Sequence, residues 1–244
     1  MRYFAELAYK GTQYAGWQNQ PNATAVQQVI EEALSTILQA PIEVVGCGRT
    51  DAGVHASQYF LHFDFAGQFP KAFIKRLNKF LPKDIVFRRI FEVENDAHAR
   101  FDATRRSYVY FLDLQPNPFY IETAWHYFNA SKLDLSTMNE VAQLLLHYKD
   151  FTPFCKSNSD AKTMICDLSR AEWIFDKKQE RLEFHISANR FLRGMVRLIV
   201  GACVYAGEGR ITIDSIRHSL DHQQPLAKSY SVPGHGLYLC EVVY

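Results

Sequence analysis

The residues best suited to chemistry stand in one glycine-rich stretch, 46–56, which reads GCGRTDAGVHA. Three glycines within eight positions indicate backbone that lies close to another group. Arg49, Thr50 and Asp51 lie between these glycines and bring together a cation, a hydroxyl and a carboxylate. A carboxylate held in such a turn is a candidate nucleophile or general base.

A structural turn, a dinucleotide-binding loop and a Walker loop are other interpretations of this stretch. Asp and Gly are ordinary turn residues, so a purely structural turn fits the composition. A dinucleotide-binding loop does not fit, because Asp51 stands where the third glycine belongs and no helix is expected to follow. A Walker loop does not fit either, because the chain has no Gly-Lys-Ser/Thr sequence. The residues alone therefore indicate an acidic site of undetermined purpose.

The elements around this stretch must support it. An apolar run at 42–45 precedes it and an alternating segment at 59–65 follows it, which predicts a connection between two strands. Hydrophobic periodicity predicts further elements in the first half of the chain. They are a strand at 2–10, a helix at 26–38 behind a Thr24–Gln27 capping box, a basic helix opened by Pro70, and a strand at 84–93. This order is typical of a ferredoxin-like, split βαβ unit.

The second half of the chain repeats the order strand, helix, strand, strand, helix, strand. Its expected elements are a strand at 107–114, a helix capped by Ser136, strands at 164–175 and 181–188, a helix within 188–210, and a closing strand within 232–244. We therefore expect an α+β protein with two ferredoxin-like halves, 1–104 and 105–244. Their antiparallel or mixed sheets are expected to face each other across a central catalytic cleft.

Three arginines stand out near the start of the helix expected within 188–210. Arg190, Arg193 and Arg197 recur at i, i+3 and i+7, which predicts that they share one side of the helix. Cations at a helix N-terminus oppose the helix dipole, so this cluster indicates an anionic partner. Two aromatic residues have simpler interpretations: Tyr108 as a strand residue, and Trp17 as a surface aromatic packed on its own loop.

Composition sets wider limits. In 244 residues, 48% are hydrophobic and 22% charged, which is typical of a soluble globular protein. A net charge of +1 neither demands nor excludes a nucleic-acid partner. The five cysteines are far apart and form no CxxC, so no disulfide framework or zinc site is expected. His218 and His222 lack a third metal ligand. With no signal-peptide core or membrane-length apolar run, we expect a cytoplasmic protein.

The sequence GRTDAGVHA at 48–56 resembles the signature of the tRNA pseudouridine synthases of the TruA type. The resemblance implies that Asp51 is catalytic. It also implies that Arg49, Thr50 and His55 belong to the substrate site, with Arg49 as the residue that takes the place of the flipped base.

Four further stretches, in the right order, extend this resemblance over nearly the whole chain. Asp-Phe-x-x-Phe at 150–154 resembles a family landmark for which packing and substrate contact are both open. Arg106-Ser107-Tyr108 resembles the motif whose Tyr stacks on the target base. Asn-x-Phe-x-x-x-Met-Val-Arg, ending at Arg197, resembles the family helix in which this Arg pairs with the catalytic Asp. Pro-x-x-Gly-Leu-x-Leu, which contains Leu237, resembles the closing strand. The further substrate contacts expected from these stretches are Arg106, Arg190, Arg193 and Leu237.

The resemblance implies an isomerase that converts uridine to pseudouridine in the anticodon stem-loop of tRNA. The target base leaves its stack, and no cofactor or metal is expected. Family members act as homodimers, so the expected partners are tRNA and a second copy of the chain, without a membrane. Two alternatives remain: an RNA-binding module that has lost the chemistry, and a carboxylate enzyme acting on a small glycoside. The latter needs a second acid at a fixed distance, and none is evident beside Asp51.

Overall fold

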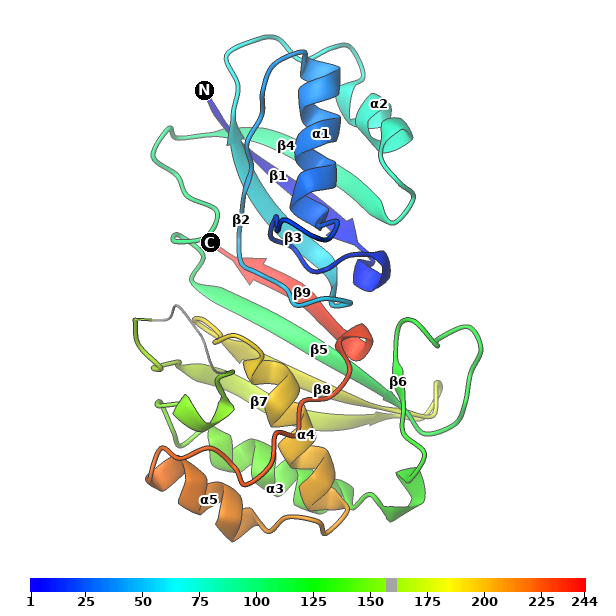
Figure 1. Cartoon of the computed structure of the whole chain (residues 1–244), viewed down its shortest axis with the longest axis vertical. Coiled ribbons are helices and arrows are strands. Elements are labelled where there is room, and N and C mark those ends of the chain that lie inside the picture. Colours follow the sequence, from blue (N-terminus) through cyan, green and yellow to red (C-terminus); the bar gives the residue numbers. More distant parts are fainter. Residues whose placement is uncertain (157–161) are drawn as a thin grey trace. The chain divides into compact units, whose positions relative to one another are not determined.

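The computed structural model describes residues 1–156 and 162–244, and these divide into two compact units (Figure 1). The N-terminal unit comprises Met1–Thr104 and Tyr238–Tyr244, and the C-terminal unit comprises Arg105–Leu237. Both units combine helices with strands. The structure thus confirms the predicted α+β class.

The closing strand β9 (Leu237–Val243) differs from the expected division into 1–104 and 105–244, because nearly all of it joins the N-terminal unit. It pairs in parallel with β3 (His55–Asp64). Two further bonds hold it there: the Val242 N–H donates to the Gln58 side chain at 3.0 Å, and the Thr104 N–H donates to the Val243 carbonyl at 2.8 Å. Such pairing between distant segments has no signature in local periodicity.

The N-terminal unit follows the ferredoxin-like order. Its elements are β1 (Arg2–Tyr9), η1 (Gly11–Gln13), α1 (Val26–Leu38), β2 (Val45–Gly46), β3, α2 (Phe73–Phe80), β4 (Ile85–Val93) and β9. The strand order is β4-β1-β3-β9, and β2 also pairs with β3. β1 is antiparallel to both β3 and β4, whereas β9 is parallel to β3, so the sheet is mixed. The side chains of β1 that alternate inward, from Tyr3 to Tyr9, are all at least nine-tenths buried.

Helix α1 begins differently from the expected capping box. Its N-cap is Ala25, and the side chain of Gln27 accepts a bond from the Asn19 N–H instead of closing a box with Thr24. The first amide groups of the helix donate to the main chain of a preceding loop, Val26 N–H to Gly16 O at 3.1 Å and Gln27 N–H to Trp17 O at 3.0 Å. Backbone carbonyls thus satisfy donors that a side-chain cap would otherwise serve.

The C-terminal unit contains an antiparallel sheet in the order β5-β8-β7, with β6 parallel to β5. Its elements are β5 (Arg105–Asp113), β6 (Trp125–His126), η2 (Ala130–Lys132), α3 (Leu135–Leu145), η3 (Thr152–Phe154), β7 (Leu168–Asp176), β8 (Arg181–Ala188), α4 (Met195–Gly207), α5 (Ile213–Asp221) and η4 (Gly234–Gly236). Helix α3 contacts both α4 and β7.

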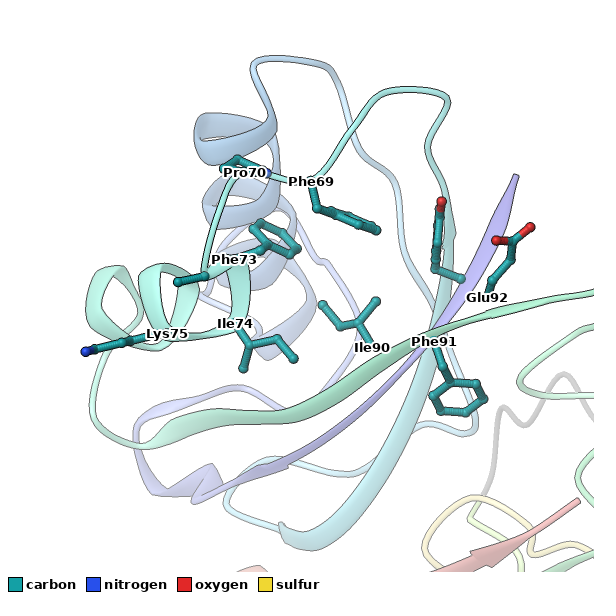
Figure 2. Close-up of a pocket in the computed structure, with 10 residues that line it drawn as sticks. Phe69, Pro70, Phe73, Ile74, Lys75, Ile90, Phe91 and Glu92 are labelled. Atoms are coloured by element: carbon teal, nitrogen blue, oxygen red, sulfur yellow. The ribbon is translucent and has the colours of Figure 1, made fainter.

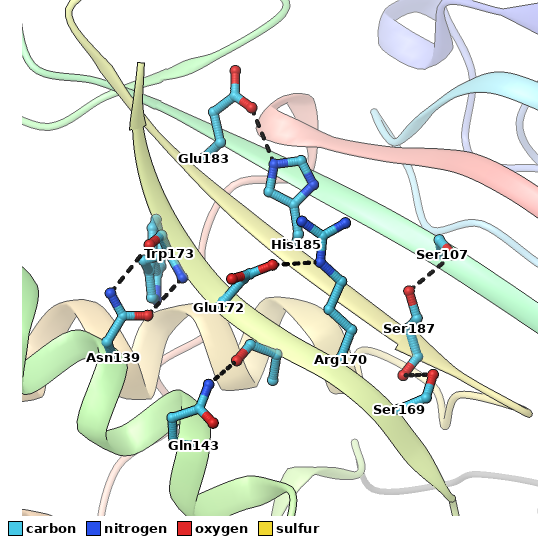
Figure 3. Close-up of polar contacts among 11 residues, drawn as sticks. Ser107, Asn139, Gln143, Ser169, Arg170, Glu172, Trp173, Glu183, His185 and Ser187 are labelled. Carbon is cyan, nitrogen blue, oxygen red and sulfur yellow. Dashed lines mark hydrogen bonds and ion pairs between the residues drawn. The ribbon is translucent and has the colours of Figure 1, made fainter. Parts of the chain in front are cut away.

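Side chains of α3 bond the main chain of β7 (Figure 3). Asn139 donates to the Trp173 carbonyl at 3.1 Å and accepts from its N–H at 2.8 Å, and Gln143 donates to the Ala171 carbonyl at 3.0 Å. These bonds serve backbone groups of a strand that pairs with β8 on one side. The cap of this helix is Asp134 rather than the expected Ser136, because the Asp134 carboxylate accepts the Ser136 N–H at 3.1 Å.

Candidate active site

The loop that carries Asp51 connects β2 to β3 in the N-terminal unit, as expected. Asp51 is half-buried. The main chain on both sides of it is bonded to a second loop: the Trp17 N–H donates to the Thr50 carbonyl at 3.1 Å, and the Gly53 N–H donates to the Tyr14 carbonyl at 3.3 Å. The loop that presents the carboxylate is therefore held in part by the main chain of its neighbour.

Thr50 and His55 are both turned into the protein. Thr50 is 8% exposed, and its hydroxyl pairs with that of Tyr9 at 2.8 Å. His55 is 1% exposed, and its Nδ1 accepts the Gly11 N–H at 2.9 Å while its ring lies 4.6 Å from that of Tyr238. Thr50 is thus bonded to β1 and His55 to η1, and their expected contacts with the substrate stay a prediction. Arg49, by contrast, is exposed.

Trp17 is a second departure from expectation. Instead of lying on the surface it is 3% exposed, and its ring stacks on Tyr59 with 4.2 Å between centroids. A Cβ at Gly46 would lie 2.6 Å from the Trp17 ring, so the glycine is needed for this close approach. The first glycine of the 46–56 stretch thus serves packing under the loop, which its sequence alone does not reveal.

In the C-terminal unit, β5 presents Arg106 and Tyr108 beside the segment that precedes α4. Arg106 Nη1 donates to the Asn189 carbonyl at 3.0 Å. Tyr108 is 9% exposed, and its ring lies edge-on to Phe191 with 5.1 Å between centroids. The side-chain Oδ1 of Asn189 accepts a hydrogen bond from the Asp167 N–H at 2.9 Å. The sequence indicated both motifs as candidate site segments, but it did not predict that they contact each other.

The helix expected to carry three arginines begins later than predicted. α4 starts at Met195, after Gly194, which has φ +71°. Arg190 and Arg193 therefore lie in the segment before the helix, and only Arg197 lies on its first turn. The prediction that the three arginines form one row on a helix is wrong. Gly194, a left-handed residue at the N-cap position, separates Arg190 and Arg193 from Arg197.

Arg197 is half-buried and oriented by the chain that leads to β9. Its Nε donates to the Val232 carbonyl at 2.7 Å. Burial lowers the pKa of the nearby His235 imidazole, and the positive charge of Arg197 adds to this shift. Leu237 follows in this segment and is 5% exposed. Its expected contact with the substrate stays a prediction.

A pocket of about 500 Å³ lies elsewhere in the N-terminal unit, between α2 and β4 (Figure 2). Its walls are mainly apolar and include Phe69, Phe73 and Ile90, with Lys75 and Glu92 at its rim. The residues that line this pocket do not include any of the 46–56 stretch. It is therefore separate from the candidate active site.

Within residues 1–156 and 162–244, His, Cys, Asp and Glu side chains form no group of three or more that could hold a metal ion. The rings of His218 and His222 lie 4.0 Å apart at the end of α5. No helix in the described part of the chain combines the length and the apolar character needed to cross a membrane.

Comparison with known proteins gives consistent matches. A family model described as tRNA pseudouridine synthase matches residues 5–102 and 141–244. Proteins named tRNA pseudouridine synthase A from Porphyromonas gingivalis and Bacteroides fragilis are 46% and 44% identical to this chain over 246 residues, covering 100% of it and 97% and 96% of their own lengths. The Bacillus subtilis protein of that name is 32% identical over 247 residues, covering 100% and 99%.

Proposed function

Because this chain belongs to the tRNA pseudouridine synthase family, we propose that it converts uridine to pseudouridine in the anticodon stem-loop of tRNA, with Asp51 as the catalytic residue. The observation that carries the proposal is the loop of Asp51, whose main chain is bonded to residues 14 and 17 on either side of the carboxylate. Such support keeps a reacting group in one orientation, which is what chemistry on a bound nucleoside requires.

The proposed reaction is an isomerisation. The bond from N1 of uracil to C1′ of the ribose breaks, the base turns, and a bond from C5 to C1′ forms. The proton leaves C5 and a proton is gained at N1, so atoms and electrons balance without an oxidant or an acceptor. Asp51 would act on C1′, on C6 or on a sugar proton. The target nucleotide would leave its stack at a cost of a few kcal/mol, which contacts with the enzyme would offset.

Each of the other residues has a proposed role. Tyr108 would stack on the flipped uracil, which is worth about 1–3 kcal/mol per base. Arg49, exposed two positions before Asp51, would occupy the space that the base leaves. Arg197 would pair with the catalytic carboxylate, for which a guanidinium is well suited because its fork binds two oxygens and stays charged.

The RNA backbone would be bound by cations outside the reacting centre. Arg190 and Arg193, in the segment before α4, are the proposed phosphate contacts, and Arg106 supports this segment through its bond to Asn189. We also propose that the protein acts as a homodimer. A tRNA substrate is in keeping with the cytoplasmic location expected from the sequence.

The test is release of tritium from tRNA that carries uridine labelled at C5. The wild-type protein should release the label, whereas Asp51→Asn should bind the same tRNA without release, because an amide keeps the shape but cannot act as nucleophile or base. Release by Asp51→Asn, once mass spectrometry has excluded deamidation, would sink the assignment. Binding without release by the wild-type protein would favour an RNA-binding module, and cleavage of a free nucleoside would favour a glycoside enzyme.

A further inference from the structure

A pair of buried hydroxyls lies directly before the candidate catalytic residue. Thr50 Oγ1 and Tyr9 Oη are 2.8 Å apart, and the two residues are 8% and 4% exposed. Burying a hydroxyl costs free energy unless it is hydrogen-bonded, whereas Val and Phe would fill almost the same space with no such demand. What the hydroxyls add is direction. The bond restrains the side chain of the residue that immediately precedes Asp51.

Tyr9 can act as a support because its own ring is packed. Its centroid lies 6.1 Å from that of Trp17 and 5.4 Å from that of Tyr59, and the latter two rings stack on each other. The Tyr59 hydroxyl also donates to the carbonyl of Gly48, within the Asp51 loop. Three aromatic side chains therefore form one buried cluster under the loop, and the hydroxyl of Tyr9 is presented from that cluster.

The main chain of the neighbouring loop comes equally close. Gly16 has φ +99°, and a Cβ at this position would lie 2.4 Å from the Thr50 carbonyl oxygen. The same carbonyl accepts the Trp17 N–H. Thr50 is thus held by its side chain and by its main chain, from two different directions. Its peptide unit, which leads into Asp51, has little freedom to turn.

We propose that Tyr9 and Thr50 are positioning residues, whose hydroxyl pair orients the Asp51 carboxylate for the reaction. The inference rests on the proposed function, in which Asp51 is the catalytic residue. A displacement of about 1 Å at a reacting group can lower a rate about 10²-fold. Because both residues are more than nine-tenths buried, loss of their hydroxyls affects the chemical step and leaves tRNA affinity unchanged.

The experiment compares Tyr9→Phe, Thr50→Val and the double variant, which remove hydroxyls but keep shape, with Thr50→Ser, which keeps the hydroxyl. Single-turnover tritium release and the Kd for tRNA are measured for each. Tyr9→Phe and Thr50→Val should each lower the rate by about 10- to 100-fold with an unchanged Kd. Thr50→Ser should retain most of the wild-type rate, because it keeps the hydroxyl. The double variant should be about as slow as the slower single variant, because both substitutions break the same bond.

Tyr244→Phe is the matched control, because it removes a hydroxyl bond of the same 2.8 Å length, to Ala99 O, elsewhere in the N-terminal unit. Its rate should equal that of the wild type. Wild-type rates for Tyr9→Phe and Thr50→Val, a loss of affinity alone, or losses that multiply in the double variant would each overturn the positioning role. Asp51→Asn is assayed in parallel. If that variant is active, the proposed function fails; if it is inactive while the hydroxyl variants are normal, only the positioning role fails.

Discussion

Two arginines four positions apart are expected to do different work. Arg193 is exposed in the segment before α4, whereas Arg197 is half-buried and held through its Nε by the Val232 carbonyl. Arg197→Met should lower the single-turnover rate about 100-fold or more, because the proposed pairing of its charge with the Asp51 carboxylate would be lost. Arg193→Met should instead weaken tRNA binding. It should also reduce the slope of log Kd against log salt by about 1, which corresponds to the loss of one phosphate contact.

The comparison needs both rates and affinities, measured across a salt series. Arg197→Lys adds a useful intermediate, because it keeps the charge but loses the planar fork and the Nε bond. If Arg193→Met stopped turnover and Arg197→Met only weakened binding, the two roles would have been assigned the wrong way round.

A buried histidine should make folding stability depend on pH. His62 is 5% exposed, and its Nδ1 accepts the Ala99 N–H at 3.0 Å. Burial, with smaller effects from Arg2 and His98, lowers the pKa of His62 from 6.5 to about 4. The unfolded chain therefore binds this proton first as pH falls. The stability that the neutral ring contributes is complete above about pH 6.5 and is lost progressively down to about pH 4, on the order of 3 kcal/mol.

Urea unfolding of the wild type and of His62→Asn between pH 7 and pH 4 measures this contribution. Asn keeps an acceptor but does not titrate, so the variant should lose less free energy of unfolding over this range than the wild type. His147→Asn, the same substitution at an exposed position, is the control. Parallel curves for the wild type and His62→Asn would contradict the assignment.

At the scale of elements, β5 and β8 are joined by a buried ion pair. Asp113 lies opposite Arg181 in the register of the two strands, and Arg181 Nε is 2.9 Å from Asp113 Oδ1. The side chain of Asp113 is 6% exposed and that of Arg181 is 8% exposed. The guanidinium also lies over the rings of Phe111 and Tyr120. Burial raises the pKa of Asp113, and the charge of Arg181 opposes this rise. The buried charge of Asp113 would therefore cost free energy without Arg181 beside it.

Removing one partner of this pair should cost more than removing both. Asp113→Leu leaves a buried guanidinium and should lower the free energy of unfolding by about 3–5 kcal/mol, whereas Asp113→Leu with Arg181→Met should recover most of the loss. Glu172→Gln is the control, because the Arg170–Glu172 pair on β7 is 45% and 42% exposed (Figure 3) and should be worth less than about 1 kcal/mol. Denaturant unfolding measures all three. A double variant as unstable as Asp113→Leu would contradict the argument.

At the scale of the whole molecule, the proposed homodimer makes a testable claim about RNA binding. A net charge of +1 gives one copy little long-range attraction for RNA. Each copy has an exposed basic row on α2 and the preceding turn, formed by Lys71, Lys75, Arg76 and Lys79. Two copies would bring two such rows to one tRNA. Sedimentation at micromolar concentration should show a dimer, and a fully active monomer would contradict it.

Much of the fold could be predicted because its signals are local. Alternation in β1, β4 and β8 and the helical period of α1 depend only on neighbouring residues, and their observed bounds agree with the predicted ones within a residue or two. The sequence by itself also determined the α+β class and the family, because the motifs around Asp51, Tyr108 and Arg197 are recognisable as strings of residues.

Only the tertiary structure decided how the candidate site is supported. Thr50 meets Tyr9 across 41 positions of sequence, and His55 meets Gly11 across 44. Trp17 is buried because Gly46 has no side chain to block its ring. The first N–H groups of α1 donate to carbonyls of the preceding loop. The late start of α4 depends on the left-handed conformation of Gly194. Contacts between residues far apart in the chain leave no periodic signal, so burial, capping and the pairing of β9 follow from packing alone.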